Sequence, residues 1–381
     1  MNSVRRRGQI KSLAKDRHMV RISLGRDCNG KRKYHSKVIT GPKSRAQKYL
    51  TGKQREIDLG MFVESSQQSL ADHIDEWLTS IRSSVANQTY SSYELLLEKH
   101  VRPRLGGLKL SEIRLSHVQS VYEGMLDAGR SPRTIQYVHS VTRRTFQKAI
   151  EQGKLLRNPC EFATLPKQRR TETKVMSPDE AKRFLEVSRS MSHGIIFELA
   201  LNTGMRPEEY LALRWSDLDL ENGVARVQRA LVWNRKGGGF QMDETKTDKS
   251  RRSVPIPEEL CSALRTHRRA QLEVRISLGP AYTNLDLVFA TELGTPLSAR
   301  NLAQRQYAAV LKDAGLENRG LVLYSLRHTC ATLLLAAGEN PKVVAERLGH
   351  TSVKMTLDTY SHVLPDMQKS ATDRLAKMLY A

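Results

Sequence analysis

The sequence is poor in the residues that build disulfide frameworks and membrane spans. It has four cysteines in 381 residues, at positions 28, 160, 261 and 330, and none of them forms a C-x-x-C pair. This wide spacing argues against a zinc site or a disulfide framework and favours a reducing compartment. No apolar run approaches the ~18 residues that a membrane span needs. The basic N-terminus also lacks the apolar stretch of a signal peptide, so we expect a cytoplasmic protein.

Acidic residues are scarce relative to basic ones. The chain has 40 Asp and Glu against 62 Lys and Arg, which gives a net charge of +22. Residues 1–60 hold 17 basic and 4 acidic residues, so 17 − 4 = 13 of these charges lie near the N-terminus. Such a cluster is typical of a protein that binds a polyanion. A solvated basic arm is the alternative, whereas an anionic membrane is disfavoured because no basic amphipathic helix with an aromatic face is present.

The first 60 residues have the pattern of a small β-ribbon followed by a helix. Residues 19–24 alternate apolar and polar side chains, and Asn29-Gly30 is a hairpin turn signal before a polar second strand that runs to Thr40. Residues 44–57 then form a basic helical pattern. A two-stranded ribbon fits the major groove of DNA, so we predict a DNA-binding domain over residues 1–60.

Helical patterns dominate the rest of the chain. We predict four helices at residues 69–81, 89–101, 111–128 and 131–152, with Pro103 ending the second and glycines ending the last two. Their aromatic residues are expected in the core rather than stacked on bases. A capping box at Ser177 opens a further helical region with a small sheet around residues 224–256. The predicted division is therefore residues 1–60, 66–167 and 173–381.

Several short motifs occur in a fixed order along the last domain. In chain order they read T-G-M-R-P-E-E at 203–209, T-K-T-D-K-S-R-R at 245–252, S-L-R-H-T-C-A-T at 325–332, E-R-L-G-H at 346–350 and T-L-D-T-Y-S-H at 356–362. Together they resemble the tyrosine recombinases of the phage-integrase type. The resemblance implies a mainly α fold with small β elements (α+β). It comprises an N-terminal arm-binding module, a helical SAM-like core-binding domain and a mostly helical catalytic domain.

The chemistry of these residues suits cutting and rejoining DNA without an energy source. A tyrosine that attacks a phosphodiester exchanges one phosphate ester for another, so the bond energy is kept and the step is reversible. A lone tyrosine is usually a core or surface residue, but the resemblance makes Tyr360 the nucleophile. Because a phosphodiester repels nucleophiles, cationic donors must surround it, and arginine grips two oxygens at once. Arg206 and Arg327 fit that role, and Glu209 is expected to orient a neighbouring arginine.

Two further motifs complete the expected site. The resemblance identifies Lys246, on a β-hairpin, as the donor of a proton to the leaving 5′ oxygen, with Lys249 as a nearby competitor. It identifies His350 as a hydrogen-bond donor to the phosphate. The family usually has H-x-x-R at the second arginine, whereas this chain has Tyr324 in the histidine position.

Tyr324 raises the question of which group removes the proton from Tyr360. A phenol is a poor base at neutral pH, and His328 is expected to point elsewhere on its helix. Proton removal is then done differently, or cleavage is slower. We predict that Tyr324→His retains recombination in a plasmid assay, because this position should tolerate the family's usual residue. Complete loss of recombination would contradict that tolerance.

The resemblance also implies partners. They are double-stranded DNA at attachment sites, a homotetramer on two sites that exchanges strands through a Holliday junction, and possible host DNA-bending and excisionase proteins. The protein would be associated with the nucleoid and would integrate and excise a mobile element such as a prophage, with no metal or other cofactor. The C-terminal tail, residues 367–381, is expected to dock on a neighbouring protomer. The expected DNA contacts are Arg5, Arg6, Arg7, Lys31, Arg32, Lys33, Arg130 and Arg133.

Three other functions remain open from the sequence. A type IB topoisomerase would use the same catalytic groups but would relax supercoiled DNA that lacks a specific site. A non-catalytic regulator derived from an integrase would explain Tyr324 as decay, although the other motif positions are intact. A basic nucleoid protein would explain the charge but none of the motifs. A covalent protein–DNA adduct that depends on Tyr360 separates an enzyme from a binding protein.

Overall fold

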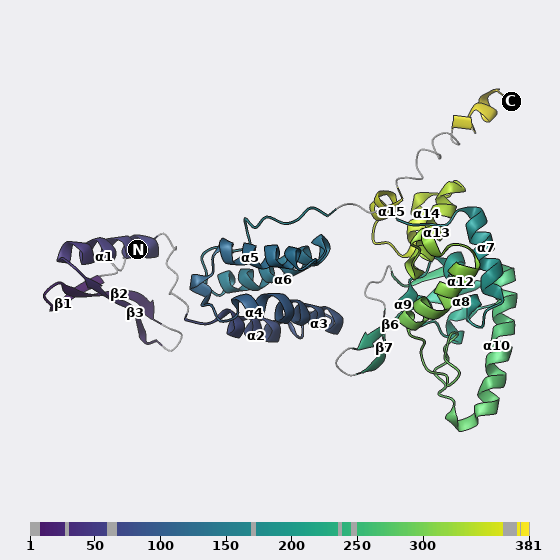
Figure 1. Cartoon of the computed structure of the whole chain (residues 1–381), viewed down its shortest axis with the longest axis horizontal. Helices are drawn as coiled ribbons and strands as arrows, with labels where there is room; N and C mark the ends of the chain where they lie inside the picture. The colour runs from purple at the N-terminus through teal and green to yellow at the C-terminus, as the bar shows by residue number, and fades with distance from the viewer. Residues whose placement is uncertain are drawn as a thin grey trace. The chain divides into compact units, whose positions relative to one another are not determined.

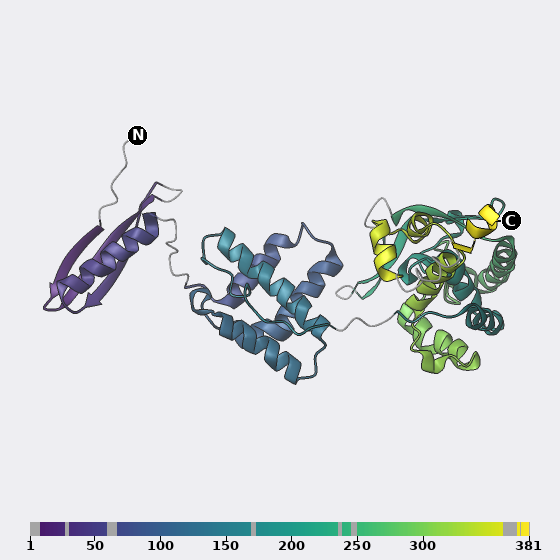
Figure 2. The ribbon, with the colours of Figure 1, turned by 90° about the horizontal axis from the view of Figure 1, so that it is seen from above.

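The computed structural model describes residues 8–26, 30–58, 67–168, 173–234, 238–244, 250–360, 372–373 and 375–380. The chain forms two compact units, residues 1–170 and residues 171–381. Figure 1 follows the chain from its N-terminal strands to its C-terminal helices, and Figure 2 gives a second view. Each unit is described by itself below.

The N-terminal part of the first unit is a three-stranded antiparallel sheet covered by one helix (Figure 2). The elements are β1 (Gly8–Ala14), β2 (Arg17–Arg26), β3 (Arg32–Thr40) and α1 (Lys43–Asp58). Val20 and Ile22 of β2 pack against Ala46 and Leu50 of α1, which confirms the alternating pattern of the predicted strand. The prediction of a two-stranded ribbon was wrong, because β1 adds an edge strand. Its side chains are mostly exposed, so the sequence carries no clear alternation there.

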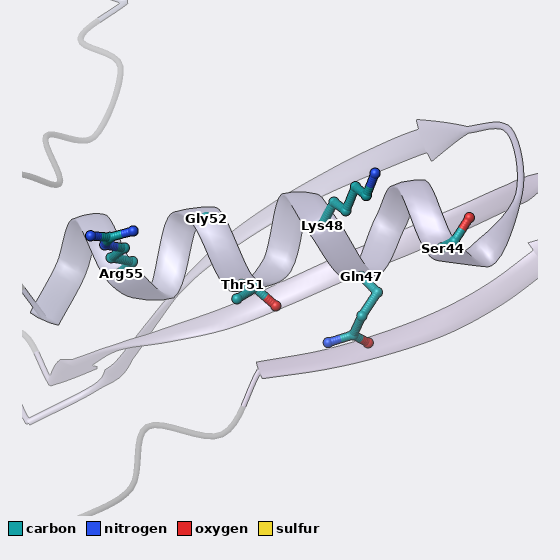
Figure 3. Close-up of a pocket in the computed structure, with 6 residues that line it drawn as sticks. All are labelled: Ser44, Gln47, Lys48, Thr51, Gly52 and Arg55. Carbon is teal, nitrogen blue, oxygen red and sulfur yellow. The ribbon is translucent and has the colours of Figure 1, made fainter.

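The outer face of α1 is polar and slightly concave. A depression of about 480 Å³ runs along it and is drawn in Figure 3. Its lining residues are Ser44, Gln47, Lys48, Thr51, Gly52 and Arg55. Gly52 has no side chain, and an added Cβ there would meet nothing within 4 Å, so the depression is open to solvent.

The second part of this unit is a helical bundle around its own core. The helices are α2 (Leu70–Ile81), α3 (Asn87–Leu96), a π-helical turn η1 (Leu97–Val101), α4 (Arg102–Leu105), a short 3₁₀ turn η2 (Leu110–Glu112), α5 (Leu115–Asp127) and α6 (Pro132–Glu151). Trp77, Tyr122 and Phe146 are buried in this core, which confirms that these aromatic residues are structural. Pro103 does not end the helical segment as predicted. The π-helical turn before it shifts the hydrogen-bond register, which accommodates a residue without an N–H group.

The second unit is mostly helical. Its helices are α7 (Pro178–Arg189), α8 (Gly194–Thr203), α9 (Pro207–Tyr210), α10 (Glu258–Leu278), α11 (Ala299–Asn301), the π-helical η6 (Leu302–Tyr307), α12 (Ala308–Asp313), α13 (Leu323–Ala336), α14 (Pro341–Leu348) and α15 (Val353–Thr359). The 3₁₀ turns are η3 (Trp215–Asp217), η5 (Gly279–Ala281) and η7 (Glu317–Arg319). The predicted capping box is present, since Ser177 Oγ accepts from the Glu180 amide and Glu180 accepts from the Ser177 amide.

Two small antiparallel sheets lie in the second unit, as predicted for residues 224–256. One has the order β4-β5-β8, formed by β4 (Leu218–Asp219), β5 (Val224–Val227) and β8 (Arg252–Pro255). The other is the hairpin of β6 (Arg229–Asn234) and β7 (Gly239–Glu244). The fold is therefore mainly helical with small sheets, which confirms the predicted fold class. Among the described residues, no helix is both long and apolar enough to cross a membrane.

Candidate active site

Arg206 is positioned by the turn between two helices. Gly204 ends α8 with a left-handed backbone (φ 64°), and Arg206 then caps the N-terminus of α9. The Arg206 guanidinium donates to Glu209 Oε1 at 2.7 Å and to the carbonyl of Gly349 at 3.4 Å. Its backbone amide donates to Glu209 Oε2 at 2.9 Å. The carboxylate thus fixes both the backbone and the side chain of Arg206.

Arg327 lies on α13 and is almost completely buried, with 1% of its surface exposed. One terminal nitrogen, Nη1, donates to the carbonyl of Gly204 at 2.7 Å. The other, Nη2, has no hydrogen-bond partner among the described residues. Burial and the neighbouring Arg206 lower the pKa of Arg327 to about 10, so it stays charged at neutral pH. Burying a charged donor without a hydrogen-bond partner costs free energy, which favours the binding of an anion next to Arg327 Nη2.

Glu209 connects Arg206 to a second arginine that the sequence analysis did not select. Arg252, on β8, donates to both carboxylate oxygens of Glu209, at 3.2 Å and 2.8 Å, and its Nε donates to the carbonyl of Arg347 at the end of α14. Burial opposes ionisation of Glu209, but the contacts with Arg252 and Arg206 hold its pKa below the usual value. The predicted orienting role of Glu209 thus has a clear geometric basis, although its effect on the reaction remains a prediction.

His350 follows a second glycine turn. Gly349 ends α14 with a left-handed backbone (φ 66°), and the next residue places its Nδ1 at 2.7 Å from Thr356 Oγ1 of α15. Burial, followed by the charges of Arg327, Arg206 and Arg252, lowers the pKa of His350 to about 4. The imidazole is therefore neutral at pH 7, with one nitrogen protonated and able to donate a hydrogen bond.

Tyr360 lies directly after α15 and is buried, with 1% of its surface exposed. It packs in a small apolar cluster with Leu335 of α13 and Leu348 of α14. Burial raises the pKa of Tyr360, and the nearby Arg327 opposes this increase. The phenol is thus neutral at pH 7, with Arg327 close enough to influence its ionisation.

The expectation that His328 points away from the site was wrong. Its Nδ1 lies 2.9 Å from the Tyr360 hydroxyl, and the two rings meet edge to face with centroids 5.8 Å apart. A helix turns by 100° per residue, so Arg327 and His328 diverge, but the Tyr360 segment approaches the side of α13 on which His328 lies. Tyr324, 36% exposed, also packs against the imidazole, with ring centroids 5.1 Å apart.

The other predicted site residues belong to the first unit or fall outside the described residues. Lys246 and the arginines at positions 5–7 fall outside the described residues. Lys31, Arg32 and Lys33 are exposed at the start of β3. Arg130 and Arg133 are exposed between α5 and α6, where Arg133 lies over the ring of Tyr137 at 5.6 Å.

Arg252 also lines a polar cavity that the sequence analysis missed. The cavity measures about 420 Å³ and is lined by residues of β5, β8 and the start of β6, with Arg226, Arg229 and Arg251 in its wall. Arg252 stands at the end of the T-K-T motif, where two adjacent arginines precede a strand with the pattern S-V-P. Its place at the start of that strand, two residues before Val254, is a sequence signal that could have identified it.

Comparisons with known proteins agree on one group. The profile described as "Phage integrase family" matches residues 174–367, and that of the "Phage integrase, N-terminal SAM-like domain" matches residues 69–126. The chain is 31% identical to "Tyrosine recombinase XerC-like" of Caldanaerobacter subterraneus subsp. tengcongensis over 382 residues, which covers 95% of this chain and 96% of that protein. It is 25% identical to the ICEBs1 integrase of Bacillus subtilis, over 97% of this chain and 100% of that protein.

Solved structures show the same fold. The Tn1549 transposon integrase in complex with transposon right end DNA superposes with a TM-score of 0.69 at 23% identity, over 81% of this chain and 100% of that chain. A lambda integrase dimer bound to a core site, determined over its residues 75–356, gives a TM-score of 0.55 at 18% identity. That match covers 76% of this chain and 97% of the other.

Proposed function

Because the chain belongs to the phage integrase family and is a tyrosine-type site-specific DNA recombinase, we propose that it integrates and excises a mobile element. The reaction would proceed through a 3′-phosphotyrosyl intermediate and a Holliday junction. The observation that best supports this reaction is the placement of two arginines at the turns of Gly204 and Gly349, with Tyr360 in the apolar cluster of Leu348. Arg327 Nη2 is a buried donor without a partner in the described residues, as a phosphate site requires.

The proposed cleavage step uses Tyr360 as the nucleophile. Its oxygen attacks the scissile phosphorus, the bond to the 5′ oxygen breaks, and Lys246 gives a proton to the leaving oxygen. Arg206, Arg327 and His350 would hold the phosphate oxygens as negative charge builds up on them. A 5′ hydroxyl of the partner strand then attacks the phosphotyrosine and releases Tyr360. One phosphate ester replaces another at each step, so no nucleotide is consumed.

DNA binding is assigned to all three parts of the chain. Residues 1–60 would bind arm sites, residues 66–167 the core site, and residues 173–381 the cleavage site. The exposed basic residues of β3 and of the α5–α6 region would contact phosphates. The arginines that line the cavity at β5 and β8 would do the same. The relatives whose structures are solved with DNA support a DNA partner for this fold.

The active assembly is proposed to be a tetramer on two sites. The described tail residues Leu375, Met378 and Leu379 are exposed apolar side chains, and this supports a tail that docks on a neighbouring protomer. A host DNA-bending protein and an excisionase would set the direction of the reaction.

The proposal is tested by trapping the covalent intermediate. On a nicked DNA substrate that carries the recombination site, the wild-type protein should form an adduct that survives denaturation and carries the label of the 3′-phosphate strand. Tyr360→Phe should abolish the adduct, because the phenol oxygen is lost, whereas the matched variant Tyr282→Phe should keep it. An adduct that persists in Tyr360→Phe, or that joins the protein to a 5′ phosphate, would contradict the proposal.

A further inference from the structure

An imidazole nitrogen lies within hydrogen-bond distance of the Tyr360 hydroxyl. His328 Nδ1 lies 2.9 Å from the Tyr360 oxygen, which is hydrogen-bond distance. His328 directly follows Arg327 on α13, so the same helical turn supplies the guanidinium that faces Gly204 and the nitrogen that contacts the phenol. Both contacts join segments that are distant in sequence.

The charge states of the two groups allow His328 to accept this hydrogen bond. Burial, followed by the charge of Arg327, lowers the pKa of His328 to about 4, so the imidazole is neutral at pH 7. Burial raises the pKa of Tyr360, so the phenol keeps its proton. In a neutral imidazole one nitrogen accepts and the other donates. In the tautomer that carries the imidazole proton on Nε2, Nδ1 accepts the hydrogen bond from the Tyr360 O–H.

Tyr324 packs against the His328 imidazole but cannot replace it as a base. The Tyr324 and His328 side chains are one helical turn apart, and their rings pack with centroids 5.1 Å apart. His328 thus contacts two phenol rings, one on its own helix and one after α15. A phenol is a poor base at neutral pH, so Tyr324 cannot take the proton of Tyr360. Within the described residues, the ring nitrogen in contact with the Tyr360 hydroxyl is Nδ1 of His328.

We propose that His328 is the catalytic base of the recombinase, which accepts the proton of Tyr360 as the phenol oxygen attacks the scissile phosphate. This inference rests on the proposed function. The O–H bond of Tyr360 breaks, an N–H bond forms at Nδ1, an O–P bond forms, and the bond between phosphorus and the 5′ oxygen breaks. A separate acid protonates the 5′ oxygen. When the next 5′ hydroxyl attacks, the conjugate base of that acid takes the hydroxyl proton, and the imidazolium returns its proton to the departing Tyr360 oxygen.

A bound phosphate strengthens this arrangement. Before DNA binds, the positive charge of Arg327 disfavours a second positive charge on His328. The scissile phosphate brings negative charge beside both residues, which stabilises the imidazolium. His328 therefore becomes a stronger base when the substrate is in place.

The test separates the proton of the nucleophile from the proton of the leaving group. Single-turnover adduct formation is measured on DNA with the natural 5′ oxygen at the scissile bond and on DNA with a bridging 5′ sulfur. A thiolate is a good leaving group that needs no proton. His328→Phe should slow adduct formation by about 10²-fold or more on both substrates. A rate within about threefold of wild type on either substrate, or a faster rate, would overturn the proposal.

A second variant distinguishes a base from a residue that only orients Tyr360. Asparagine places its Oδ1 near the position of Nδ1 and can accept the hydrogen bond, but an amide does not hold a proton at neutral pH. His328→Asn should therefore melt within a few degrees of wild type and still cleave about 10²-fold more slowly. Cleavage at the wild-type rate in this variant would overturn the assignment.

The matched control is His193→Asn in the same unit. His193 is also half-buried, and its Nδ1 contacts Ser192 and Gln306 rather than the site. The His193→Asn protein should cleave both substrates at the wild-type rate. If the wild-type protein itself forms no adduct, the proposed function fails. If it does and the His328 variants match it, only this inference fails.

Discussion

At the scale of single residues, the site depends on charged side chains that hold one another. Glu209 lies between Arg206 and Arg252, and the contacts with Arg252 are the first cause of its lowered pKa after the opposing effect of burial. The motif T-G-M-R-P-E-E indicates Arg206 and Glu209, which are three residues apart on one turn. Arg252 comes from a strand 43 residues further along the chain. Its contribution is visible in the structure and not in the spacing of any motif.

Loss of Arg252 should weaken both stability and cleavage. Arg252→Ala leaves Glu209 buried with only one arginine, and breaking such a pair costs about 3 kcal/mol of unfolding free energy. The released carboxylate also holds Arg206 less firmly, so single-turnover adduct formation should slow. Chemical denaturation and the adduct assay measure the two effects.

The control for Arg252 is an exposed ion pair in the same unit. Arg265 contacts Glu258 at 2.6 Å, but both side chains are largely in solvent. Solvent screens such exposed pairs, so Arg265→Ala should leave stability and cleavage nearly unchanged. Equal effects of the two substitutions would show that Arg252 has no special role.

At the scale of elements, two left-handed glycine turns bring the site together. Gly204 ends α8 and its carbonyl accepts from Arg327, while Gly349 ends α14 and its carbonyl accepts from Arg206. Each turn thus exposes a carbonyl oxygen to an arginine of a different segment. A helix stop at a glycine is readable from sequence, but the partner of its carbonyl is not.

Substitution of Gly349 should show that this turn does more than end a helix. A Cβ at Gly349 would lie 3.0 Å from Arg252 Nη1, and the left-handed backbone strains any L side chain. We expect Gly349→Ala to lower the unfolding free energy by about 1–2 kcal/mol from backbone strain and to slow adduct formation by displacing Arg252.

Gly315→Ala is the matched control for the glycine turn. It has the same left-handed backbone (φ 68°), and its Cβ would meet nothing within 4 Å. It should lose similar stability, measured by thermal or chemical denaturation, with cleavage unchanged. A Gly349→Ala protein that cleaves like Gly315→Ala would contradict the displacement of Arg252.

At the scale of the whole molecule, positive charge is concentrated in a part with its own core. The sheet and α1 pack around Val20, Ile22, Ala46, Leu50 and Ile57, and the helical bundle packs around a different set of residues. Residues 1–60 carry 13 of the 22 net positive charges. Removing them should therefore leave the other cores folded while changing how the protein binds DNA.

Deletion of residues 1–60 should reduce the salt dependence of DNA binding. Fewer phosphates are neutralised, so the plot of log binding constant against log salt concentration becomes less steep. Adduct formation on a DNA that carries only the cleavage site should continue, at a higher protein concentration. An unchanged salt slope in a filter-binding or fluorescence titration would contradict a DNA-binding role for this part.

Much of the molecule follows from local sequence signals. The strand of Val20 and Ile22, the capping box at Ser177, the cap of α14 at Asn340 and the glycine helix stops are all set by neighbouring residues, whose backbone preferences act over a few positions. Pro103 shows the limit of such signals. The helical segment continues through this proline after the π-helical turn η1, although proline alone predicts a helix end. The edge strand β1 was missed because its side chains face solvent and leave no apolar pattern.

The sequence by itself determined the family, the mainly helical fold and the choice of Arg206, Arg327 and Tyr360 as candidate site residues, because these depend on motifs and on local backbone preference. Only the tertiary structure decided which side chains touch. It brought Arg252 from β8 to Glu209, the Gly349 carbonyl to Arg206, and His328 to the Tyr360 hydroxyl. Those contacts join segments far apart in the chain, and their geometry is set by how α13, α14 and α15 pack around a shared core, which residue spacing along the chain does not encode.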